Sequence, residues 1–209
     1  MKFYDCETAP SPRRVRIFLA EKGIDIDTQQ VDLRSGEQFS DTFRAVNPDC
    51  TVPVLVLDDG TVLSEVFAIC QYLEETHPEP PILGRDATER ALVTMWNTKI
   101  EQQALAAVAE VFRNKSKGFK GRALTGPEDF EQLPALVERG MTRLLQFYDR
   151  LDHHLSTQKY VAGDSFTLAD ITAFVATEFA GWLKVEIGED RPDLNRWYKK
   201  IKSRPASNN

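Results

Sequence analysis

Two short segments in the first half of the chain combine residue types that could bind a peptide-like ligand. Val52-Pro53 comes just before an apolar strand, and Glu65-Val66 opens a helix directly after another strand. A cis bond before Pro53 would leave the N–H and C=O of Val52 without a partner in the sheet, so an extended peptide could pair with them. The local sequence favours the alternative of a trans proline that only starts the strand, because about 5–6% of X-Pro bonds in folded proteins are cis.

The second segment, Glu65-Val66, offers two kinds of charge recognition. A helix N-terminus has free N–H groups and a partial positive charge, which suit a carboxylate or a phosphate. The carboxylate of Glu65 could receive an ammonium group, so the two features together match the zwitterionic end of an amino acid. Alternatively, Glu65 only complements the dipole of its own helix, which is the commoner role of a first-turn glutamate.

The start of the first predicted helix carries a hydroxyl and several cations. Ser11 is a good N-cap residue, with Pro12 at the first helical position. Arg13, Arg14 and Arg16 stand near the helix start, where cations oppose the macrodipole. They form either a solvated surface, the usual role of a charge run, or a positive region that holds an anion.

Alternating strand and helix signals in residues 1–78 must position these groups. We predict strands at residues 2–5 and 29–33, and a hairpin at residues 54–63 around the turn Asp58-Asp59-Gly60. Helices are predicted at residues 11–23, 37–46 and 65–75, the first with Gly23 as its left-handed stop. The predicted order is therefore β-α-β-α-β-β-α.

The rest of the chain shows helix patterns only. Pro80-Pro81 cannot continue a helix and indicates a linker. Residues 86–89 and 167–170 have the form of capping boxes that open helices, and residues 118–126 indicate a loop. We therefore predict an α/β domain at residues 1–78, a linker at residues 79–88 and an all-helical domain at residues 89–209.

The composition argues against several classes of protein. The chain has 209 residues and a net charge of -6, which disfavours nucleic acid as the main partner. Cys6, Cys50 and Cys70 form no CxxC pair, and with three histidines in the chain neither a disulfide framework nor a metal site is expected. No apolar run approaches the roughly 20 residues of a membrane span, and no secretory signal is seen. A reducing cytoplasm is the expected location.

Five stretches together resemble a cytosolic glutathione transferase. They are residues 11–23, residues 38–48, Thr51-Val52-Pro53-Val54-Leu55, residues 65–73, and residues 160–171, which include Gly163-Asp164-Ser165-Phe166-Thr167-Leu168-Ala169-Asp170-Ile171. The order and spacing of these motifs make the resemblance specific over essentially the whole chain. It is closest to the yeast glutathione transferase II type and its bacterial counterparts. The resemblance implies a thioredoxin-like N-terminal domain followed by an all-helical C-terminal domain.

The resemblance also implies a set of glutathione contacts. Pro53 would follow a cis bond, and the backbone of Val52 would pair with the cysteinyl part of glutathione. Glu65 and the N–H of Val66 would hold the γ-glutamyl end, and Gln38 would approach the glycyl end. Thr167 and Asp170 would have a structural role at the start of a helix. Glutathione would be a co-substrate, with no metal.

The sequence departs from the family pattern where the thiol is usually activated. Ala9 stands at the usual serine position, and Val66 stands where many transferases have a serine. A free thiol with a pKa near 8.5 is only a few per cent thiolate at neutral pH. We expect the N-terminus of the first helix to stabilise the thiolate, helped by Ser11 or a bound water. Asn114 is the second catalytic candidate.

The helical domain would supply the electrophile pocket. Phe112, Arg113, Ser116 and Phe119 are the candidates, with Trp96 and Trp182 as further aromatic material, although ordinary core is the commoner role of each aromatic residue. The expected activity is conjugation of the glutathione thiolate to small apolar electrophiles by a homodimer, which implies a role in detoxification. The alternatives are a catalytically weak binding protein on the same fold, or a glutathione-dependent reductase in which Cys50 acts.

Overall fold

The computed structural model describes residues 1–208, which separate into two units. The first unit contains residues 1–80 with the short segment 124–129, and the second contains residues 81–123 and 130–208. These bounds compare with the predicted α/β domain at residues 1–78 and the predicted helical domain from residue 89. Nothing in the sequence indicated that residues 124–129 belong with the first unit, because a short polar loop does not reveal the surface on which it packs.

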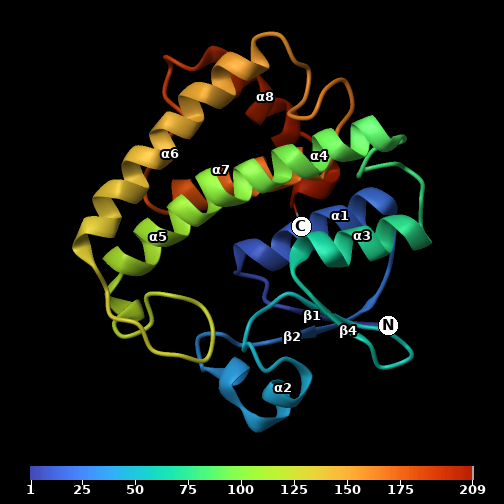
Figure 1. The fold of residues 1–209 in the computed structure, drawn as a ribbon, viewed down its shortest axis with the longest axis vertical. Coiled ribbons are helices and arrows are strands. Elements are labelled where there is room, and N and C mark those ends of the chain that lie inside the picture. Colours follow the sequence, from blue (N-terminus) through green and yellow to red (C-terminus); the bar gives the residue numbers. More distant parts are fainter. Residues whose placement is uncertain (209) are drawn as a thin grey trace. The chain divides into compact units, whose positions relative to one another are not determined.

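The first unit is built on a four-stranded sheet in the order β2-β1-β3-β4 (Figure 1). The strands are β1 (Lys2–Asp5), β2 (Asp27–Gln30), β3 (Val54–Val56) and β4 (Val62–Ser64). Strand β1 runs parallel to β2 and antiparallel to β3, and β3 and β4 form the predicted hairpin.

Helices cover both faces of this sheet. Helices α1 (Pro10–Lys22) and α3 (Val66–Thr76) pack against each other on one face, and η1 (Glu37–Phe39) and α2 (Asp41–Val46) lie on the other (Figure 1). Strand residues alternate between the faces. Val54 joins Phe43 and Val31 in the core on the α2 side. This arrangement confirms the predicted thioredoxin-like fold.

Helix α1 begins two residues earlier than predicted. Ala9 is the N-cap, and Pro10 opens the helix, so the predicted N-cap role of Ser11 is wrong. Two prolines fit into this turn because the first N–H groups of a helix have no intrahelical acceptor. Gly23 ends the helix in the left-handed conformation, with φ of 64°, as predicted.

Two other predicted elements differ in their bounds. Strand β2 consists of polar residues at the sheet edge, so it shows no apolar alternation, and Val31 beyond it enters the core instead. The helix predicted at residues 37–46 is split, because Ser40 is extended and caps α2 by accepting a hydrogen bond from the N–H of Phe43 at 3.2 Å.

Lys22 fixes the end of the first unit. Its ammonium group is fully buried and donates to the carbonyl oxygens of His77 at 2.7 Å and Pro80 at 2.8 Å. It also pairs with Glu74 at 2.7 Å. The three acceptors compensate the desolvation of this charge, and they join the C-terminal ends of α1 and α3.

The second unit is helical, as predicted. Its long helices are α4 (Ala87–Ile100), α5 (Ala106–Lys115), α6 (Pro134–Leu155), α7 (Leu168–Gly181) and α8 (Pro192–Lys202), with short turns η3 (Lys117–Phe119) and η4 (Pro205–Asn208). A π-helical turn, η2 (Glu101–Leu105), joins α4 and α5 without a break. Within residues 1–208, no strand follows β4, and no helix is long and apolar enough to cross a bilayer.

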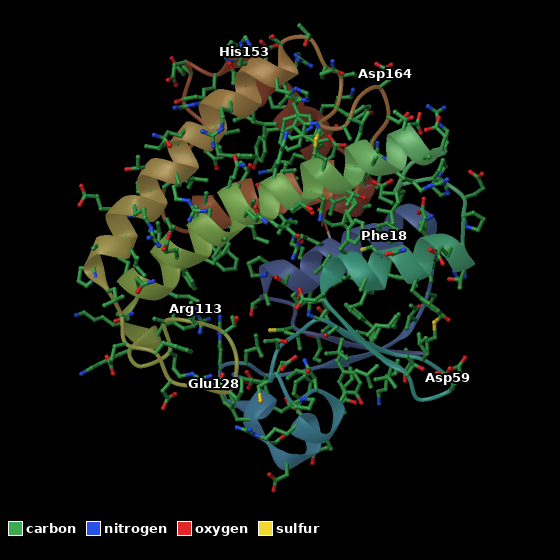
Figure 2. The ribbon with its side chains drawn as sticks, in the orientation of Figure 1. Phe18, Asp59, Arg113, Glu128, His153 and Asp164 are labelled. Carbon is green, nitrogen blue, oxygen red and sulfur yellow. The ribbon has the colours of Figure 1, made fainter. Side chains whose placement is uncertain are left out.

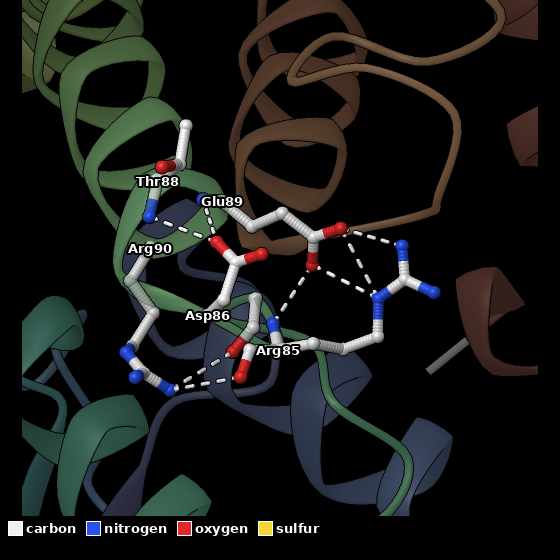
Figure 3. A network of polar contacts seen from close by, with 6 residues as sticks. Arg85, Asp86, Thr88, Glu89 and Arg90 are labelled. Atoms are coloured by element: carbon white, nitrogen blue, oxygen red, sulfur yellow. Dashed lines mark hydrogen bonds and ion pairs between the residues drawn. The ribbon is translucent and has the colours of Figure 1, made fainter.

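Asp86 caps α4 as predicted (Figure 3). The second hydrogen bond of a capping box, in which the side chain of Glu89 would accept from the N–H of Asp86, is replaced. The carboxylate of Asp86 accepts from the N–H groups of Thr88 and Glu89 at 2.8 and 2.9 Å. The carboxylate of Glu89 accepts from the N–H of Arg85 at 2.8 Å and from its guanidinium group, rather than from the N–H of Asp86. These bonds to Arg85 lower the pKa of Glu89 to about 2.

The predicted capping box of Thr167 and Asp170 opens α7. Asp170 is fully buried and accepts from the N–H groups of Val161 and Thr167, both at 2.9 Å, and from Nε1 of Trp197 at 2.8 Å. Burial raises the pKa of Asp170 to about 6 in spite of these donors. Asp170 therefore connects α7, α8 and the loop before α7.

Gly140 of α6 allows a close approach to α5. A Cβ atom at this position would lie 2.8 Å from Cγ2 of Val111 and 2.9 Å from the carbonyl oxygen of Ala107. We predict that Gly140→Ala lowers the free energy of unfolding by about 1–3 kcal/mol, because overpacking exceeds the gain in helix propensity. Denaturant unfolding measures the change.

The matched control is Gly181→Ala at the end of α7, where an added Cβ meets nothing within 4 Å. This variant should be neutral or slightly more stable than the parent protein. Equal stability of the two variants would contradict the close α5–α6 contact.

Candidate functional site

The loop before β3 presents an unpaired backbone edge. The Val52-Pro53 bond is cis, as the family resemblance implied and against the odds from the local sequence. Among the described residues, neither the N–H nor the C=O of Val52 enters a backbone hydrogen bond of the sheet or of the surrounding turns. Val52 can therefore pair with an extended ligand.

Asn47 holds this loop in place, a role that the sequence analysis missed. Its side chain is buried and donates to the carbonyl oxygen of Thr51 at 2.9 Å, while its Oδ1 accepts from the N–H of Asp49 at 3.1 Å. Cys50 in the same loop has a φ of 53°. This left-handed conformation suits glycine best, and the small side chain of cysteine occupies the position here. An asparagine followed by proline between a helix and a strand was the available signal.

No side chain caps the N-terminus of α3. Glu65 is the N-cap residue, with φ of 69° and ψ of 125°, and its exposed side chain makes no capping hydrogen bond. The first turn of α3 contains no acidic residue, so the N–H groups of Val66 and its neighbours remain available to an anion. A glutamate held at positive φ is strained, which is typical of residues kept for function.

The first turn of α1 offers a single free backbone donor. Pro10 and Pro12 have no N–H, the N–H of Ala9 bonds to the oxygen of Cys6 at 2.9 Å, and that of Arg13 bonds to the oxygen of Ala9 at 3.3 Å. Within residues 9–13, the N–H of Ser11 is thus the one donor without a backbone acceptor.

Arg14 and Arg16 have different roles near this turn. Arg14 is buried, and its Nη2 donates to Oγ of Ser11 at 3.4 Å. Because the hydroxyl accepts there, its own proton is free to be donated elsewhere. Arg16 pairs with Asp5 at 2.6 Å and donates to the oxygen of Glu7 at 2.9 Å, so it fixes the loop between β1 and α1. The run of three arginines in the sequence does not distinguish these roles.

Strand register brings the three features to one edge of the sheet. Tyr4 pairs with Val54, and Val54 pairs with Ser64. Strand β3 lies between β1, which leads into α1, and β4, which leads into α3. The cis bond before Pro53, at the start of β3, therefore lies between the end of β1 and the start of α3. An unpaired strand edge and two uncapped helix N-termini meet there. They can hold an extended peptide with a carboxylate at one helix and a second negative charge at the other.

Gln38 belongs to the same unit and lies in η1. Its Oε1 is buried and has no hydrogen-bond partner among the described residues. A buried acceptor without a donor is costly, so the side chain is suited to a ligand N–H.

The candidate pocket residues of the helical unit gather at the end of α5. The Phe112 and Phe119 ring centroids are 5.1 Å apart, and the guanidinium carbon of Arg113 lies 4.5 Å from the Phe119 centroid. Trp182 is also close, at 5.9 Å from Phe112. Trp96 is not part of this group, because it packs against His154 at 4.2 Å.

Asn114 and Ser116 contribute to the helix end. The buried amide of Asn114 donates to the oxygen of Glu110 at 2.8 Å and accepts from the N–H of Leu133 at 2.8 Å. Ser116 ends α5, and its carbonyl oxygen accepts from Gln132 at 2.8 Å. Both ends of the Asn114 amide are therefore engaged, one within α5 and the other with the segment before α6.

The cysteine thiols are buried. Cys6, Cys50 and Cys70 are free thiols and all buried. In the part of the chain that the structure describes, no group of three or more His, Cys, Asp or Glu side chains is arranged to hold a metal ion.

Comparisons with known proteins identify both halves of the chain. Residues 8–76 match the model of the glutathione S-transferase N-terminal domain, and residues 99–205 match that of the glutathione S-transferase C-terminal domain. Glutathione S-transferase 2 of Saccharomyces cerevisiae is 35% identical over 99% of this chain and 87% of its own length. Maleylacetoacetate isomerase of Rattus norvegicus is 30% identical over 83% of this chain and 75% of its own length.

Solved structures agree with these sequence matches. A glutathione S-transferase domain-containing protein of Marinobacter aquaeolei has a TM-score of 0.92 and 36% identity, covering 99% of this chain and 100% of that one. Gtt2 of Saccharomyces cerevisiae has a TM-score of 0.91 and 33% identity, covering 100% and 99%. A glutathione S-transferase of Methylobacillus flagellatus with bound glutathione has a TM-score of 0.82 and 27% identity, covering 99% and 96%.

The resemblance to the yeast glutathione transferase II type and its bacterial counterparts is thus confirmed. Family models match both halves of the chain, and curated relatives that align over nearly its whole length are named as glutathione S-transferases. The chain belongs to the glutathione S-transferase family, and it is a glutathione transferase.

Proposed function

We propose that glutathione lies along the Val52 edge and that its thiolate attacks small apolar electrophiles. The backbone of Val52, ahead of Pro53, pairs with the cysteinyl part. Glu65 receives the ammonium group of the γ-glutamyl end, and the N–H of Val66 binds its carboxylate. The observation that carries this proposal is the meeting of an unpaired strand edge with two uncapped helix N-termini.

Gln38 completes the proposed glutathione site at the glycyl end. The acceptor of its side chain is buried and unpaired, and the glycyl N–H is a donor of the matching kind. The glycyl end then lies on the η1 side of the unit, away from the start of α3.

The sulfur is proposed to be ionised by Ser11. Ala9 has no polar side chain, so the N–H and hydroxyl of Ser11 are the donors at the start of α1. Arg14 orients the hydroxyl and adds a positive charge. Each unit by which the thiol pKa falls corresponds to about 1.36 kcal/mol of preferential thiolate stabilisation, which is within reach of two donors and a helix dipole. Asn114 has a structural role in this proposal, because its amide is already engaged.

The other two hypotheses are less well supported. A glutathione-dependent reductase needs an accessible cysteine thiolate, whereas Cys50 is buried with its thiol directed to the oxygen of Pro48 at 3.4 Å. A binding protein without activity would not need a donor at Ser11. Turnover of an electrophile by the purified protein separates that hypothesis from ours.

We also propose, from the family resemblance and the three free cysteines, that the protein works as a homodimer in the cytoplasm. Its role there would be the detoxification of electrophiles. The electrophile is held at the end of α5, where Phe112, Arg113, Ser116 and Phe119 are the pocket residues.

Ser11 carries the central prediction. Ser11→Ala removes the hydroxyl and keeps the N–H, whereas Ser11→Pro removes both donors in a turn that already tolerates proline. We predict that the pKa of bound glutathione rises by about 1 unit in the first variant and by about 2 units in the second. The thiolate absorbance of the complex, titrated with pH, measures both values.

Ser203→Ala, at the end of α8, is the control and should leave the titration unchanged. The KM for glutathione and the melting temperature show whether each variant still folds and binds. An unchanged thiol pKa in both Ser11 variants would show that other groups ionise the sulfur.

Glu65 combines strain with the proposed ammonium contact. Glu65→Gly should raise the free energy of unfolding by about 1 kcal/mol, because glycine tolerates positive φ, and should weaken glutathione binding about 10-fold or more. Glu65→Gln should weaken binding similarly without the gain in stability. Calorimetric titration and thermal unfolding provide the two measurements.

Glu75→Gln, near the other end of α3, is the matched control and should bind glutathione normally. Tight binding by both Glu65 variants would refute the ammonium contact.

A further inference from the structure

The loop between β1 and α1, residues 6–9, decides where the first turn of α1 lies. Strand β1 before the loop is paired with β3, which follows directly on Val52 and Pro53. Ser11 after the loop belongs to α1. The distance between the donors of Ser11 and the Val52 edge therefore depends on this loop keeping one conformation.

The later turns of α1 are fixed by the core. Val15 and Phe18 are completely buried, and α1 packs against α3 (Figure 2, in which Phe18 is labelled). Apolar contacts are not directional, so they allow small shifts of the helix along its axis. Fixing the first turn to the precision that a hydrogen bond requires takes polar contacts of defined geometry.

Arg16 ties α1 to the end of β1 and to the loop. Its Nη1 donates to Oδ1 of Asp5 at 2.6 Å and to the carbonyl oxygen of Cys6 at 3.3 Å. Its Nη2 donates to the carbonyl oxygen of Glu7 at 2.9 Å. Because Arg16 and Ser11 belong to the same helix, these bonds limit movement of the first turn relative to the end of the strand.

Gln30 of β2 holds the same loop. Its Nε2 donates to Oδ2 of Asp5 at 2.7 Å, and its Oε1 accepts from the N–H of Glu7 at 2.8 Å. Asp5 is buried, and its two carboxylate oxygens are engaged by Arg16 and Gln30. The polar character of strand β2 thus has a use at this end of the sheet.

The three side chains form one network around the loop backbone. Together, Arg16 and Gln30 engage the N–H and the C=O of Glu7 and the C=O of Cys6, and Asp5 links the two. The positive charge of Arg16 matches the buried charge of Asp5. All of these residues belong to the first unit. A shift of the loop would break several of these hydrogen bonds at once.

We infer that Gln30 and Arg16, linked through Asp5, are positioning residues that hold the first turn of α1 opposite the Val52 edge. This inference rests on the proposed function, in which that turn ionises the thiol of glutathione. The two side chains act through the loop and not by touching the ligand. A donor displaced by about 1 Å forms a much weaker hydrogen bond to sulfur. Loosening the loop therefore reduces thiolate stabilisation and leaves the binding contacts of Val52 and Glu65 in place.

Gln30→Leu and Arg16→Lys test the inference. Leucine removes both hydrogen bonds of Gln30 without changing the net charge, and lysine keeps the positive charge of Arg16 without its fork of donors. The thiol pKa of bound glutathione, titrated by thiolate absorbance, should rise by about 0.5 unit or more in each variant, while the calorimetric Kd for glutathione stays within about 2-fold of the parent value. Gln29→Leu, the same substitution on the opposite face of β2, is the matched control and should change neither quantity.

A purely structural role of the network predicts a different result. In that case Gln30→Leu and Arg16→Lys lower the melting temperature, the thiol pKa keeps its parent value, and the inference is overturned. A rise of the pKa in Arg16→Lys cannot come from a lost positive charge, because lysine retains it. If Gln30→Leu titrates like the parent protein, hydrogen bonding to the loop does not matter, and the inference is overturned as well.

Amide hydrogen exchange separates this inference from the proposed function, because NMR measures it on the protein without glutathione. The N–H of Glu7 is bonded to Gln30 and that of Ala9 to the oxygen of Cys6. Both should exchange about 10-fold faster in Gln30→Leu and Arg16→Lys than in the parent protein and in Gln29→Leu.

Unchanged exchange in both variants would refute the inference, whatever the Ser11 variants show. Faster exchange and a raised thiol pKa in these two variants, with an unchanged pKa in Ser11→Ala and Ser11→Pro, would refute the proposed role of Ser11 and keep the positioning role of the network.

Discussion

An ionised sulfur needs hydrogen-bond donors at fixed positions, and this requirement gives the start of α1 its importance. Prolines at positions 10 and 12 leave Ser11 as the one unengaged backbone donor of the first turn. The same serine supplies a hydroxyl whose lone pair accepts from Arg14. In the proposed mechanism one residue therefore contributes two donors, and the usual hydroxyl side chain at position 9 is not required. In the same proposal, the strand edge at Val52 places the thiol opposite this turn.

Sheet register provides that placement. Pairing of β3 with both β1 and β4 sets the Val52 edge between the two helix N-termini, and Asn47 keeps the preceding loop in one conformation. Glu65 remains at positive φ in the turn between β4 and α3. In the proposed function, ligand binding by its carboxylate explains why this strained conformation is retained. Lys22 holds the far ends of α1 and α3 together. These contacts surround an edge that the backbone of the unit leaves unpaired.

Much of the fold could be predicted from the sequence, because its signals are local. Turn residues, capping boxes and apolar periodicity located the elements of the first unit and the starts of α4 and α7, and the spacing of the motifs indicated the family. The bounds of α5, α6 and α8 were not predicted, because the second half of the chain showed helix patterns without clear ends. The errors have separate causes. Strand β2 lacks apolar alternation because it is a polar edge strand, and the true start of α1 depends on which of two prolines opens the helix. The engagement of Asn114 and the role of Arg16 depend on distant partners, Leu133 and Asp5, which no local pattern reveals.

The most direct test of the account is a crystal structure of the protein with glutathione bound. The proposed mechanism predicts that the sulfur lies within about 3.2 Å of Oγ or the backbone nitrogen of Ser11. The cysteinyl backbone should pair with Val52. A sulfur bonded to a different donor and out of reach of Ser11 would contradict it.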